Sequence, residues 1–431
     1  MEEVFFLSIN DFSKRGYGLS DNFEVFGALP GDEIKAQKIK RGKAKLVELI
    51  TASNHRVVPK FPYEGACGGC TFQQLDYKEQ LILKQKRLKS LFTITPEPMI
   101  PCDNPFEYRN KMEFTFSQDK AGKRFLGLHM PQTKGRIVDL STCHLVSPWF
   151  TEVLDKVRKW WEEHELPAFK PHRGEGVLRT ITIREGKRTG ARMVLLTVSG
   201  KARDAITMPA LEAFKQLFNK DISLFLIIQQ ATAGRPTQFF EMHLQGPDHL
   251  TEELHIDQRI LRFKISPLAF FQPNTFQAEK LYQAALNLIP TPGNHLLDLY
   301  AGTATLGMLF APYTKQVTSI ELNPYSILDA EENLVQNQIS NLSLIRGDVA
   351  EHLPIAADTI ILDPPRSGLG PKACAQINAL DAKQILYISC NPTTQAEDLA
   401  HLSNYTLTHL QPVDQFPHTP HLETIALLEH I

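Results

Sequence analysis

From about residue 265 onward, the chain alternates short apolar runs with longer amphipathic segments. Strands and helices that alternate in this way are typical of a parallel sheet with helices on its faces. The apolar runs end in small polar or glycine-containing turns, which indicates buried strands. The expected elements are a helix over 276–288 and strands over 295–300, 317–322, a run ending at Arg346, 359–362 and 385–388.

Residues 1 to about 58 show a different pattern, in which short apolar runs are separated by glycine and proline. This pattern predicts the short strands of a small barrel. The segment 34–50 alternates apolar and basic residues, which predicts a strand pair with cations on its solvated face. Such a run is usually no more than a solvated face, and the functional alternative is a surface that tracks a phosphate backbone.

The region between these two parts is also predicted to be rich in strands. Its expected elements are strands over 112–117, 177–184 and 193–199 and helices over 77–91 and 151–164. The whole chain is therefore expected to have three domains. These are a small β-barrel over residues 1–58, a β-rich middle domain over 59–264 and a Rossmann-like α/β domain over 265–431.

Length and composition narrow the class of protein. A chain of 431 residues with 42% hydrophobic and 22% charged residues is expected to fold into two or three globular domains. It contains no run of about 18 uncharged apolar residues, so no membrane span is expected. Its acidic start, Met1–Phe6, lacks the basic segment of a signal peptide. A cytoplasmic location follows, in which the six cysteines are expected to be metal-bound, catalytic or free.

The formal net charge of −2 hides an asymmetry along the chain. Residues 265–431 carry 6 Lys/Arg against 16 Asp/Glu, which leaves 40 against 32 for residues 1–264. The basic residues of the first part are dense in 35–45 and 173–192. A cationic part next to an acidic part favours a polyanionic partner, and the alternative is an ordinary drift of surface charge between domains.

Cys390 directly follows the predicted strand 385–388 and a single serine. In an open α/β sheet, ligands and chemistry lie at the carboxyl ends of the strands. A thiol at this edge is well placed to act as a nucleophile, because thiolates are the most reactive protein nucleophiles. The alternative is that Cys390 is a small buried apolar residue, as most single cysteines are.

Several acidic residues are predicted to lie at the same edge of the sheet. Glu321 ends the second strand, 19 residues after the turn glycine Gly302, where an acid takes the two ribose hydroxyls of a nucleoside. Asp348 follows the third strand, where an acid meets an adenine amino group. Asp363 is held by the two prolines that stop the fourth strand, and Glu423 begins the last strand. Because the Gly-x-Gly-x-x-Gly turn for a diphosphate is missing and Ala304 stands where glycine is usual, S-adenosylmethionine is favoured over NAD.

Cys67 and Cys70 form a Cys-x-x-Cys pair with two glycines between them. Such a pair turns two thiolates toward one point, as zinc and iron–sulfur sites require. A redox pair is the alternative, but no βαβ pattern surrounds it. Cys143 is the candidate third ligand, and Cys102 or His144 the candidate fourth.

Four motifs taken together resemble those of the RNA uracil-5-methyltransferases. They are Phe271-Gln272-Pro273-Asn274, Asp363-Pro364-Pro365-Arg366-Ser367-Gly368, Ser389-Cys390-Asn391-Pro392 and Phe416-Pro417-His418-Thr419 with His421-Leu422-Glu423. They occur in the family's order, and the likeness spans nearly the whole chain. The N-terminal barrel resembles the TRAM domain, an OB-like barrel that many of these enzymes carry, including those that act on 23S ribosomal RNA.

The resemblance implies a role for individual residues. Cys390 would be the nucleophile and Glu423 the base, and Phe270 matches a position that stacks near a flipped base. The S-adenosylmethionine site would include Gln272, Tyr300, Thr305, Glu321 and Asp363. Cys67, Cys70 and Cys143 match three of the four ligands of a [4Fe–4S] cluster. The family's first cysteine, six residues before this pair, is replaced by Phe61. Such a cluster would therefore be held by three cysteines, be completed by Cys102 or another group, or be lost.

The function expected is transfer of a methyl group from S-adenosylmethionine to C5 of a uridine in RNA. Ribosomal RNA is favoured over transfer RNA by analogy, because the barrel is more typical of the ribosomal enzymes. One alternative is an amino-group N-methyltransferase, which usually has an aromatic residue where Arg366 stands and has no use for Cys390. Another is a non-catalytic RNA-binding scaffold. The protein is expected to be a monomer that binds RNA and no membrane.

Overall fold

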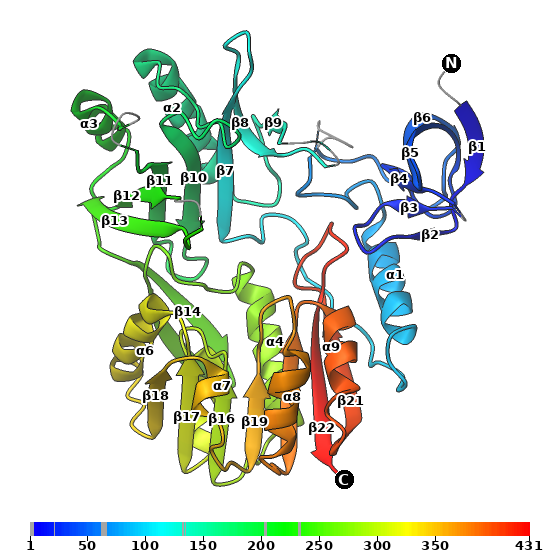
Figure 1. Cartoon of the computed structure of the whole chain (residues 1–431), viewed down its shortest axis with the longest axis vertical. Helices are drawn as coiled ribbons and strands as arrows, with labels where there is room; N and C mark the ends of the chain where they lie inside the picture. Colours follow the sequence, from blue (N-terminus) through cyan, green and yellow to red (C-terminus); the bar gives the residue numbers. More distant parts are fainter. Residues whose placement is uncertain are drawn as a thin grey trace.

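The computed structural model of the chain contains three large sheets in sequence order and a two-stranded hairpin (Figure 1). It describes residues 4–20, 22–61, 67–131, 133, 135–201, 205–231 and 234–431. Residues 1–3 of the acidic N-terminal stretch and residues 62–66, which precede Cys67, lie outside the described residues. No described helix is long and apolar enough to cross a membrane.

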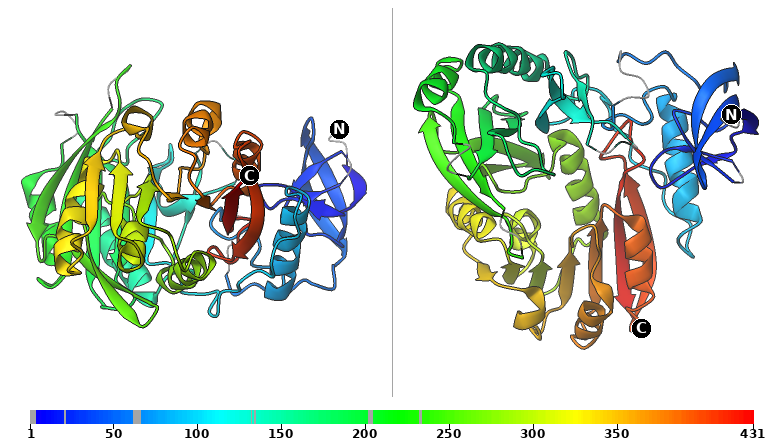
Figure 2. Two further views of the ribbon diagram at one scale, coloured as in Figure 1. Left: turned by 90° about the horizontal axis from the view of Figure 1, so that it is seen from below. Right: turned by 45° about the horizontal axis from the view of Figure 1, so that its top comes forward.

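The N-terminal sheet is small and strongly curled (Figure 2). Its core is a cluster of small and branched apolar residues that includes Val25, Ile34 and Ala44. The predicted strand pair over 34–50 is confirmed as two antiparallel strands, but its solvated side exposes apolar residues such as Ile39 as well as cations. The strands, in the order β1-β5-β6-β4-β3-β2, are β1 (Val4–Ser8), β2 (Asp11–Phe12), β3 (Gly18–Leu19), β4 (Glu24–Phe26), β5 (Glu33–Lys40) and β6 (Lys43–Thr51).

The central sheet is covered by a long amphipathic helix, α2 (Pro148–His164). Phe150, Val153, Val157 and Trp161 recur at helical spacing on one face and are fully buried, so this face packs into the core. A shorter helix, α3 (Met208–Gln216), packs beside it. The strands, in the order β13-β12-β11-β10-β7-β8-β9, are β7 (Lys111–Gln118), β8 (Arg124–His129), β9 (Ile137–Asp139), β10 (Leu178–Glu185), β11 (Arg192–Ser199), β12 (Ser223–Gln230) and β13 (Gln238–Gln245).

The C-terminal sheet has the order β18-β17-β16-β19-β20-β22-β21, and all its strands are parallel except β22, which is antiparallel to both neighbours. The α/β class predicted from the alternating pattern is therefore confirmed. The strand order reverses between β16 and β19, which is where open α/β sheets bind ligands. The strands are β16 (His295–Leu299), β17 (Gln316–Glu321), β18 (Leu342–Arg346), β19 (Thr359–Leu362), β20 (Gln384–Ser389), β21 (Tyr405–Val413) and β22 (Glu423–His430).

Helices cover both faces of this sheet (Figure 1). They are α4 (Thr275–Leu288), α5 (Thr305–Phe310), α6 (Pro324–Gln336), α7 (Val349–His352), α8 (Gly370–Asn378) and α9 (Pro392–Leu399), with a 3-10 turn over Ala311–Tyr313. The hairpin of β14 (Leu250–Ile256) and β15 (Arg259–Ile265) shares the apolar core of the sheet and α4. Because this core crosses residue 265, the domain boundaries expected from the sequence stay a prediction.

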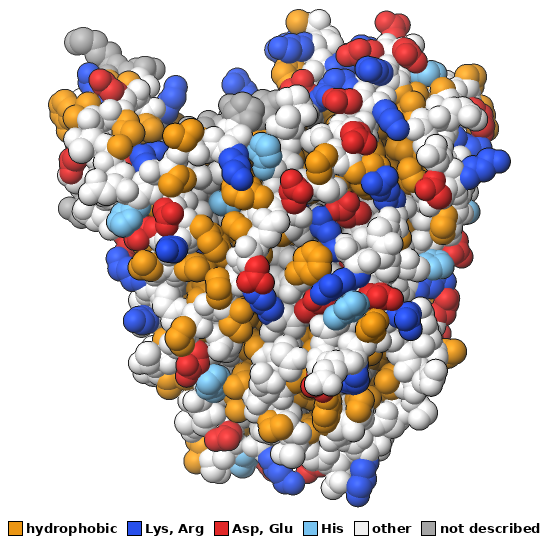
Figure 3. Space-filling model, turned by 180° about the vertical axis from the view of Figure 1, so that it is seen from behind, with side chains coloured by type: hydrophobic (Ala, Val, Ile, Leu, Met, Phe, Trp, Pro, Cys, Tyr) orange, Lys and Arg blue, Asp and Glu red, His pale blue; other side chains and the backbone are white. Residues whose placement is uncertain are grey.

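Helix α1 (Tyr77–Lys89) connects the N-terminal sheet to the C-terminal one. Asp76 caps its first turn by accepting hydrogen bonds from the backbone N–H groups of Lys78 and Glu79, as N-cap residues do. Leu88 of α1 and Phe92 just after it belong to the core of the C-terminal sheet. Figures 1 and 2 show α1 beside β21 and β22. Figure 3 shows a broad notch at the top of the molecule, between the N-terminal and central sheets.

Candidate active site

Cys390 and Glu423 meet at one edge of the C-terminal sheet. β20 and β22 are antiparallel neighbours in which Ser389 pairs with Thr424. Cys390 is the next residue after Ser389, and Glu423 is the residue before Thr424, so the register brings them side by side. The negative charge of Glu423 contributes to raising the pKa of the Cys390 thiol. A thiol and a carboxyl that lie in separate sequence motifs therefore share one site.

The Cys390 thiol is half-buried, and burial is the main reason that its pKa rises to about 11. Glu423 raises this pKa further, whereas the nearby Arg366 guanidinium lowers it. The thiol opens into a pocket of about 220 Å³. The pocket is lined by Lys14, Arg87, Arg366, Cys390, Asn391, Pro392, Pro420, His421 and Leu422.

A cluster of buried carboxyl groups lies next to Cys390. Burial, followed by the charge of Asp298, raises the pKa of Asp363 to about 7. Burial, followed by the charge of Asp363, raises the pKa of Glu423 well above its usual range, and Arg366 opposes this shift. Burial also raises the pKa of Asp298 to about 7. Such a cluster disfavours more negative charge and favours a bound cation.

The turn after β16 has an unusual backbone. Tyr300, Gly302 and Ala304 all have left-handed φ values, of 61°, 56° and 56°. Ala304, which stands where glycine is usual, thus adopts the conformation that glycine enters without strain. Strained backbone of this kind is concentrated at functional sites. A side chain built at Gly302 would meet no atom within 4 Å, so the turn faces open space.

The acids predicted to bind a nucleoside surround this turn. Glu321 accepts hydrogen bonds from the backbone N–H groups of Gly302 (2.8 Å) and Asn323 (2.6 Å), which fixes its carboxylate at the end of β17. Asp348 is exposed and caps α7 by accepting from the N–H of Ala350 (2.9 Å). Burial, followed by the charge of Asp348, raises the pKa of Tyr300 to about 12. The tyrosine and Asp348 therefore lie on the same side of the sheet edge.

The remaining predicted binding residues fall into two groups. Thr305 is buried at the first position of α5, and its hydroxyl lies 3.2 Å from that of Thr303. Gln272 is buried, and its amide contacts Tyr282. Burial, followed by the charges of Asp363 and Glu423, raises the pKa of Tyr282, so Gln272 and Tyr282 lie near the carboxyl cluster. Phe270, in contrast, is 60% exposed and does not line the Cys390 pocket.

The site as a whole fits S-adenosylmethionine. Open space at Gly302 leaves room for an adenosyl group against the turn. Glu321, Asp348 and Asp363 stand at the ends of β17, β18 and β19, which lie on the two sides of β16. The Oδ1 atom of Asp298 is buried without a hydrogen-bond partner, which buried polar atoms rarely are. The carboxyl cluster suits the positive charge of a sulfonium.

Comparison with known proteins agrees with this geometry. The model of the tRNA (uracil-5-)-methyltransferase family matches residues 76–357 and 354–431. The chain belongs to this family. It is 44% identical to an uncharacterized RNA methyltransferase of Protochlamydia amoebophila, over 94% of this chain and 99% of the relative, and 34% identical to one of Clostridium acetobutylicum, over 97% and 95%.

A solved structure covers almost the same length. The tRNA (uracil-54, C5)-methyltransferase of Pyrococcus abyssi, in complex with S-adenosyl-L-homocysteine, has a TM-score of 0.80 and 27% identity and covers 98% of this chain and 99% of its own. This uracil-5-methyltransferase family member is therefore an S-adenosylmethionine-dependent RNA methyltransferase. The predicted family, fold and S-adenosylmethionine cofactor are confirmed.

The predicted cluster ligands lie in the central sheet's core. Burial, and then the charges of Cys67 and Cys143, raise the pKa of Cys70 well above its usual range, so the three thiols lie near one another. Phe61 is only 3% exposed and packs into the same core. Cys102 lies elsewhere, with its thiol donating to the Asn104 carbonyl at 3.2 Å.

A fourth thiolate is therefore missing from this group. Among the described residues, no set of three or more His, Cys, Asp and Glu side chains is arranged to hold a metal ion. A [4Fe–4S] cluster normally takes four cysteine ligands, so the residues present do not fit one.

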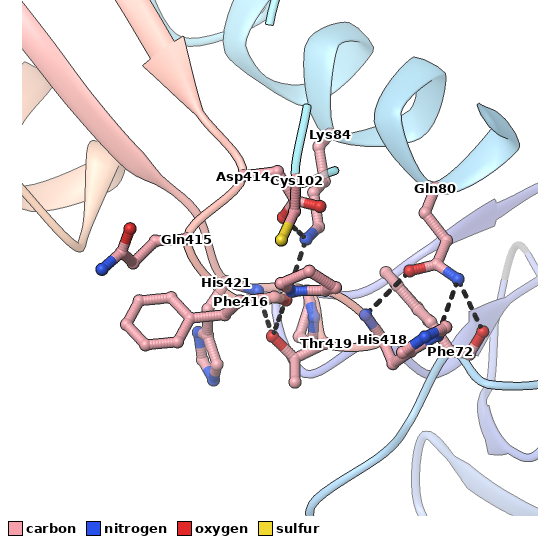
Figure 4. Close-up of polar contacts among 12 residues, drawn as sticks. Phe72, Gln80, Lys84, Cys102, Asp414, Gln415, Phe416, His418, Thr419 and His421 are labelled. Atoms are coloured by element: carbon pink, nitrogen blue, oxygen red, sulfur yellow. Dashed lines mark hydrogen bonds and ion pairs between the residues drawn. The ribbon is translucent and has the colours of Figure 1, made fainter. Parts of the chain in front are cut away.

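Residues 414–421, which form most of the loop between β21 and β22, are held by α1 (Figure 4). The Lys84 ammonium donates to Asp414 at 2.5 Å, and both side chains are fully buried. The Tyr77 hydroxyl donates to the other oxygen of Asp414 at 2.7 Å. Gln80 accepts from the backbone N–H of His418 at 2.9 Å, and His418 itself is left-handed, with a φ of 63°. The loop that leads into Glu423 is thus fixed by a helix more than 300 residues earlier.

The sequence motifs did not reveal the roles of Arg366 and Asp298, or the pairing of Lys84 with Asp414. Arg366 stood inside the quoted Asp-Pro-Pro-Arg motif without a role, and the signal was a cation directly after the two prolines. Asp298 was overlooked although it is an acid inside an otherwise apolar strand, which is unusual for a buried strand. The partnership of Lys84 with Asp414 left no local signal at all.

We expect Lys84→Met to destabilise the protein by about 3–5 kcal/mol, because it leaves the Asp414 carboxylate buried without its partner. The double variant Lys84→Met with Asp414→Leu should recover much of that loss. Urea unfolding of the three proteins measures both effects. Lys86→Met is the matched control, since the exposed Lys86 pair with Asp11 is worth at most about 1 kcal/mol. A single variant as stable as the control would show that the ion pair does not hold the loop.

Proposed function

We propose that this enzyme methylates C5 of a uridine in RNA through a covalent adduct between Cys390 and C6 of the base. The supporting observation is that Cys390 and Glu423 meet at the end of β20, beside Asp363. A thiol and a carboxyl at one carbon are what this reaction needs. The reaction of an amino-group methyltransferase would not use the thiol and the carboxyl together.

The chemistry explains why both groups are required. C5 of uracil is a poor nucleophile, and attack of the Cys390 thiolate at C6 moves electron density onto C5. S-adenosylmethionine supplies the methyl group that C5 then accepts. Glu423 removes the remaining C5 proton, the sulfur–C6 bond breaks, and the thiolate leaves as the double bond re-forms.

Arg366 and the carboxyl cluster set the charge of the two reacting groups. Arg366 favours the thiolate form of Cys390, because it lowers the pKa that burial and Glu423 raise. Burial, followed by the charge of Asp363, raises the pKa of Glu423 and so favours its neutral form in the free protein. A sulfonium bound beside it would favour the ionised carboxylate, which is the form that accepts the C5 proton. No step requires electron transfer, so the reaction proposed makes no use of an iron–sulfur cluster.

The target base must leave any helix to reach Cys390. Enzymes that act on a base flip it out or take it from a single strand. The exposed Phe270 ring is the proposed stacking surface for the flipped base, and the N-terminal sheet the proposed TRAM-like RNA-binding domain. The three-domain division at residues 58 and 264, the monomeric state and the cytoplasmic location stay predictions.

The RNA substrate has two candidates. Ribosomal RNA was favoured because of the N-terminal barrel. The Pyrococcus abyssi tRNA enzyme covers 98% of this chain, barrel included, so the barrel does not discriminate, and this match favours transfer RNA. Mapping 5-methyluridine in 23S rRNA and in tRNA, from cells with and without the gene, decides between them. Loss of 5-methyluridine from neither RNA would contradict uridine methylation.

We expect Cys390→Ala to abolish turnover and Glu423→Gln to accumulate protein linked covalently to RNA. The first variant lacks the atom that attacks C6, and the second cannot remove the C5 proton that precedes elimination. Denaturing electrophoresis with labelled RNA and S-adenosylmethionine measures the adduct. Glu397→Gln, an exposed carboxyl on α9, is the control and should behave as wild type. If Glu423→Gln turned over normally without trapping RNA, the base would be another residue.

We expect S-adenosylmethionine to bind about tenfold more weakly at pH 6 than at pH 8. The Asp363 carboxyl, whose pKa is about 7 in the free protein, must lose its proton to face the sulfonium. Affinity should therefore rise with pH and level off above 7. Calorimetry measures it, with S-adenosylhomocysteine as the control, because its sulfur is uncharged. Equal pH dependence for both ligands, or its persistence in Asp363→Asn, would remove Asp363 from this role.

A further inference from the structure

The mouth of the Cys390 pocket is built by three distant parts of the chain. Lys14 comes from the turn between β2 and β3 in the N-terminal sheet, Arg87 from α1, and Arg366 from the segment after β19. All three carry positive charge. The pocket of about 220 Å³ is smaller than the roughly 300–1,000 Å³ of drug-sized ligand sites, which suits the entry of a single base.

Arg87 lacks a counter-ion in the part of the chain that the structure describes. Its guanidinium is half-buried and makes two long hydrogen bonds to neutral acceptors, the Pro420 carbonyl (3.5 Å) and the Thr393 hydroxyl (3.4 Å). Burial lowers its pKa, and no carboxylate among the described residues opposes this shift. A partly buried cation is normally paired, because desolvation is costly. The planar fork of donors that remains open matches a phosphate group.

Lys14 reaches the pocket because the β2–β3 turn docks on the active-site loop. Gly16 in this turn has a φ of 76°, and a side chain there would come within 3.2 Å of Pro420 and 2.9 Å of Thr71. The turn is closed by hydrogen bonds from Gly16 N–H to the Ser13 carbonyl and from Ser13 N–H to the Tyr17 carbonyl, both 2.8 Å. Lys14 itself is exposed and forms no ion pair with any described residue. The docking therefore presents a free ammonium at the pocket.

We propose that Lys14 and Arg87 bind the phosphates of the RNA nucleotides next to the uridine that enters the Cys390 pocket. The proposal rests on the function proposed above and adds the residues that position the strand. It makes the N-terminal sheet part of the active site rather than a remote anchor. A base drawn into the pocket would then have its backbone held by charges from two elements, one on the N-terminal sheet and one on α1.

The test is the salt dependence of RNA binding, measured with a short single-stranded oligouridylate. Lys14→Gln and Arg87→Gln should each reduce the slope of log K against log salt by about 0.7, because each loses one phosphate contact on a single strand. Lys86→Gln is the matched control. Lys86 lies on α1, as Arg87 does, but its charge is already paired with Asp11. Equal slopes for test and control variants would overturn the proposal.

A second measurement separates phosphate contact from a structural effect. Oligonucleotides with neutral methylphosphonates beside the target uridine should bind wild type and Lys14→Gln equally, and Arg87→Lys should restore part of the salt slope. S-adenosylmethionine affinity should not change in either variant, which checks that the fold is intact. If the slopes fall as expected but Glu423→Gln forms no adduct, the phosphate contacts stand and only the proposed chemistry fails. A Lys14→Gln defect that persists on the methylphosphonate RNA would contradict the contact.

Discussion

Strand β22 runs antiparallel to β20, and this reversal brings Glu423, at the start of β22, to the edge where β20 ends at Cys390. If β22 were parallel, its first residue would lie at the opposite edge of the sheet. The six residues of β20 span about 20 Å, so thiol and carboxyl would be too far apart to act on one base. The antiparallel register is the constraint on which the rest of the site depends.

The distribution of charge decides which ligands the site favours. Three buried carboxyl groups lie close together: besides burial, the charge of Asp298 raises the pKa of Asp363, and the charge of Asp363 raises the pKa of Glu423. Their mutual repulsion is a cost that a bound cation relieves. A sulfonium cofactor meets that condition, whereas a neutral or anionic one does not. At the mouth of the pocket the sign is reversed, because Arg366, Arg87 and Lys14 line it. The site thus divides into an acidic interior, which suits a cationic cofactor, and a cationic entrance, which suits a polyanion such as RNA.

The parts of the chain outside the sheet hold this arrangement in place. Helix α1 fixes the 414–421 loop through the buried Lys84–Asp414 pair and the Gln80 contact with His418. The backbone N–H of Phe72 donates to the His418 carbonyl at 3.0 Å, and the β2–β3 turn packs on Pro420. The N-terminal sheet, α1 and the last loop therefore form one packed unit over Glu423. A displacement of the N-terminal sheet would therefore move Glu423.

The sequence by itself determined many of the strands and helices and several residues with chemical character. Strands such as β19 and helices such as α2 follow from local periodicity, because burial of one face depends on nearest neighbours along the chain. Cys390, Asp363 and Glu423 were found because strand ends have recognisable local patterns. Only the tertiary structure decided that Lys84 pairs with Asp414, that Arg366 lowers the pKa of Cys390, and that Lys14 lines the Cys390 pocket. Contacts between residues far apart in sequence depend on how the sheets and α1 pack together, and no local pattern of polar and apolar residues encodes that packing.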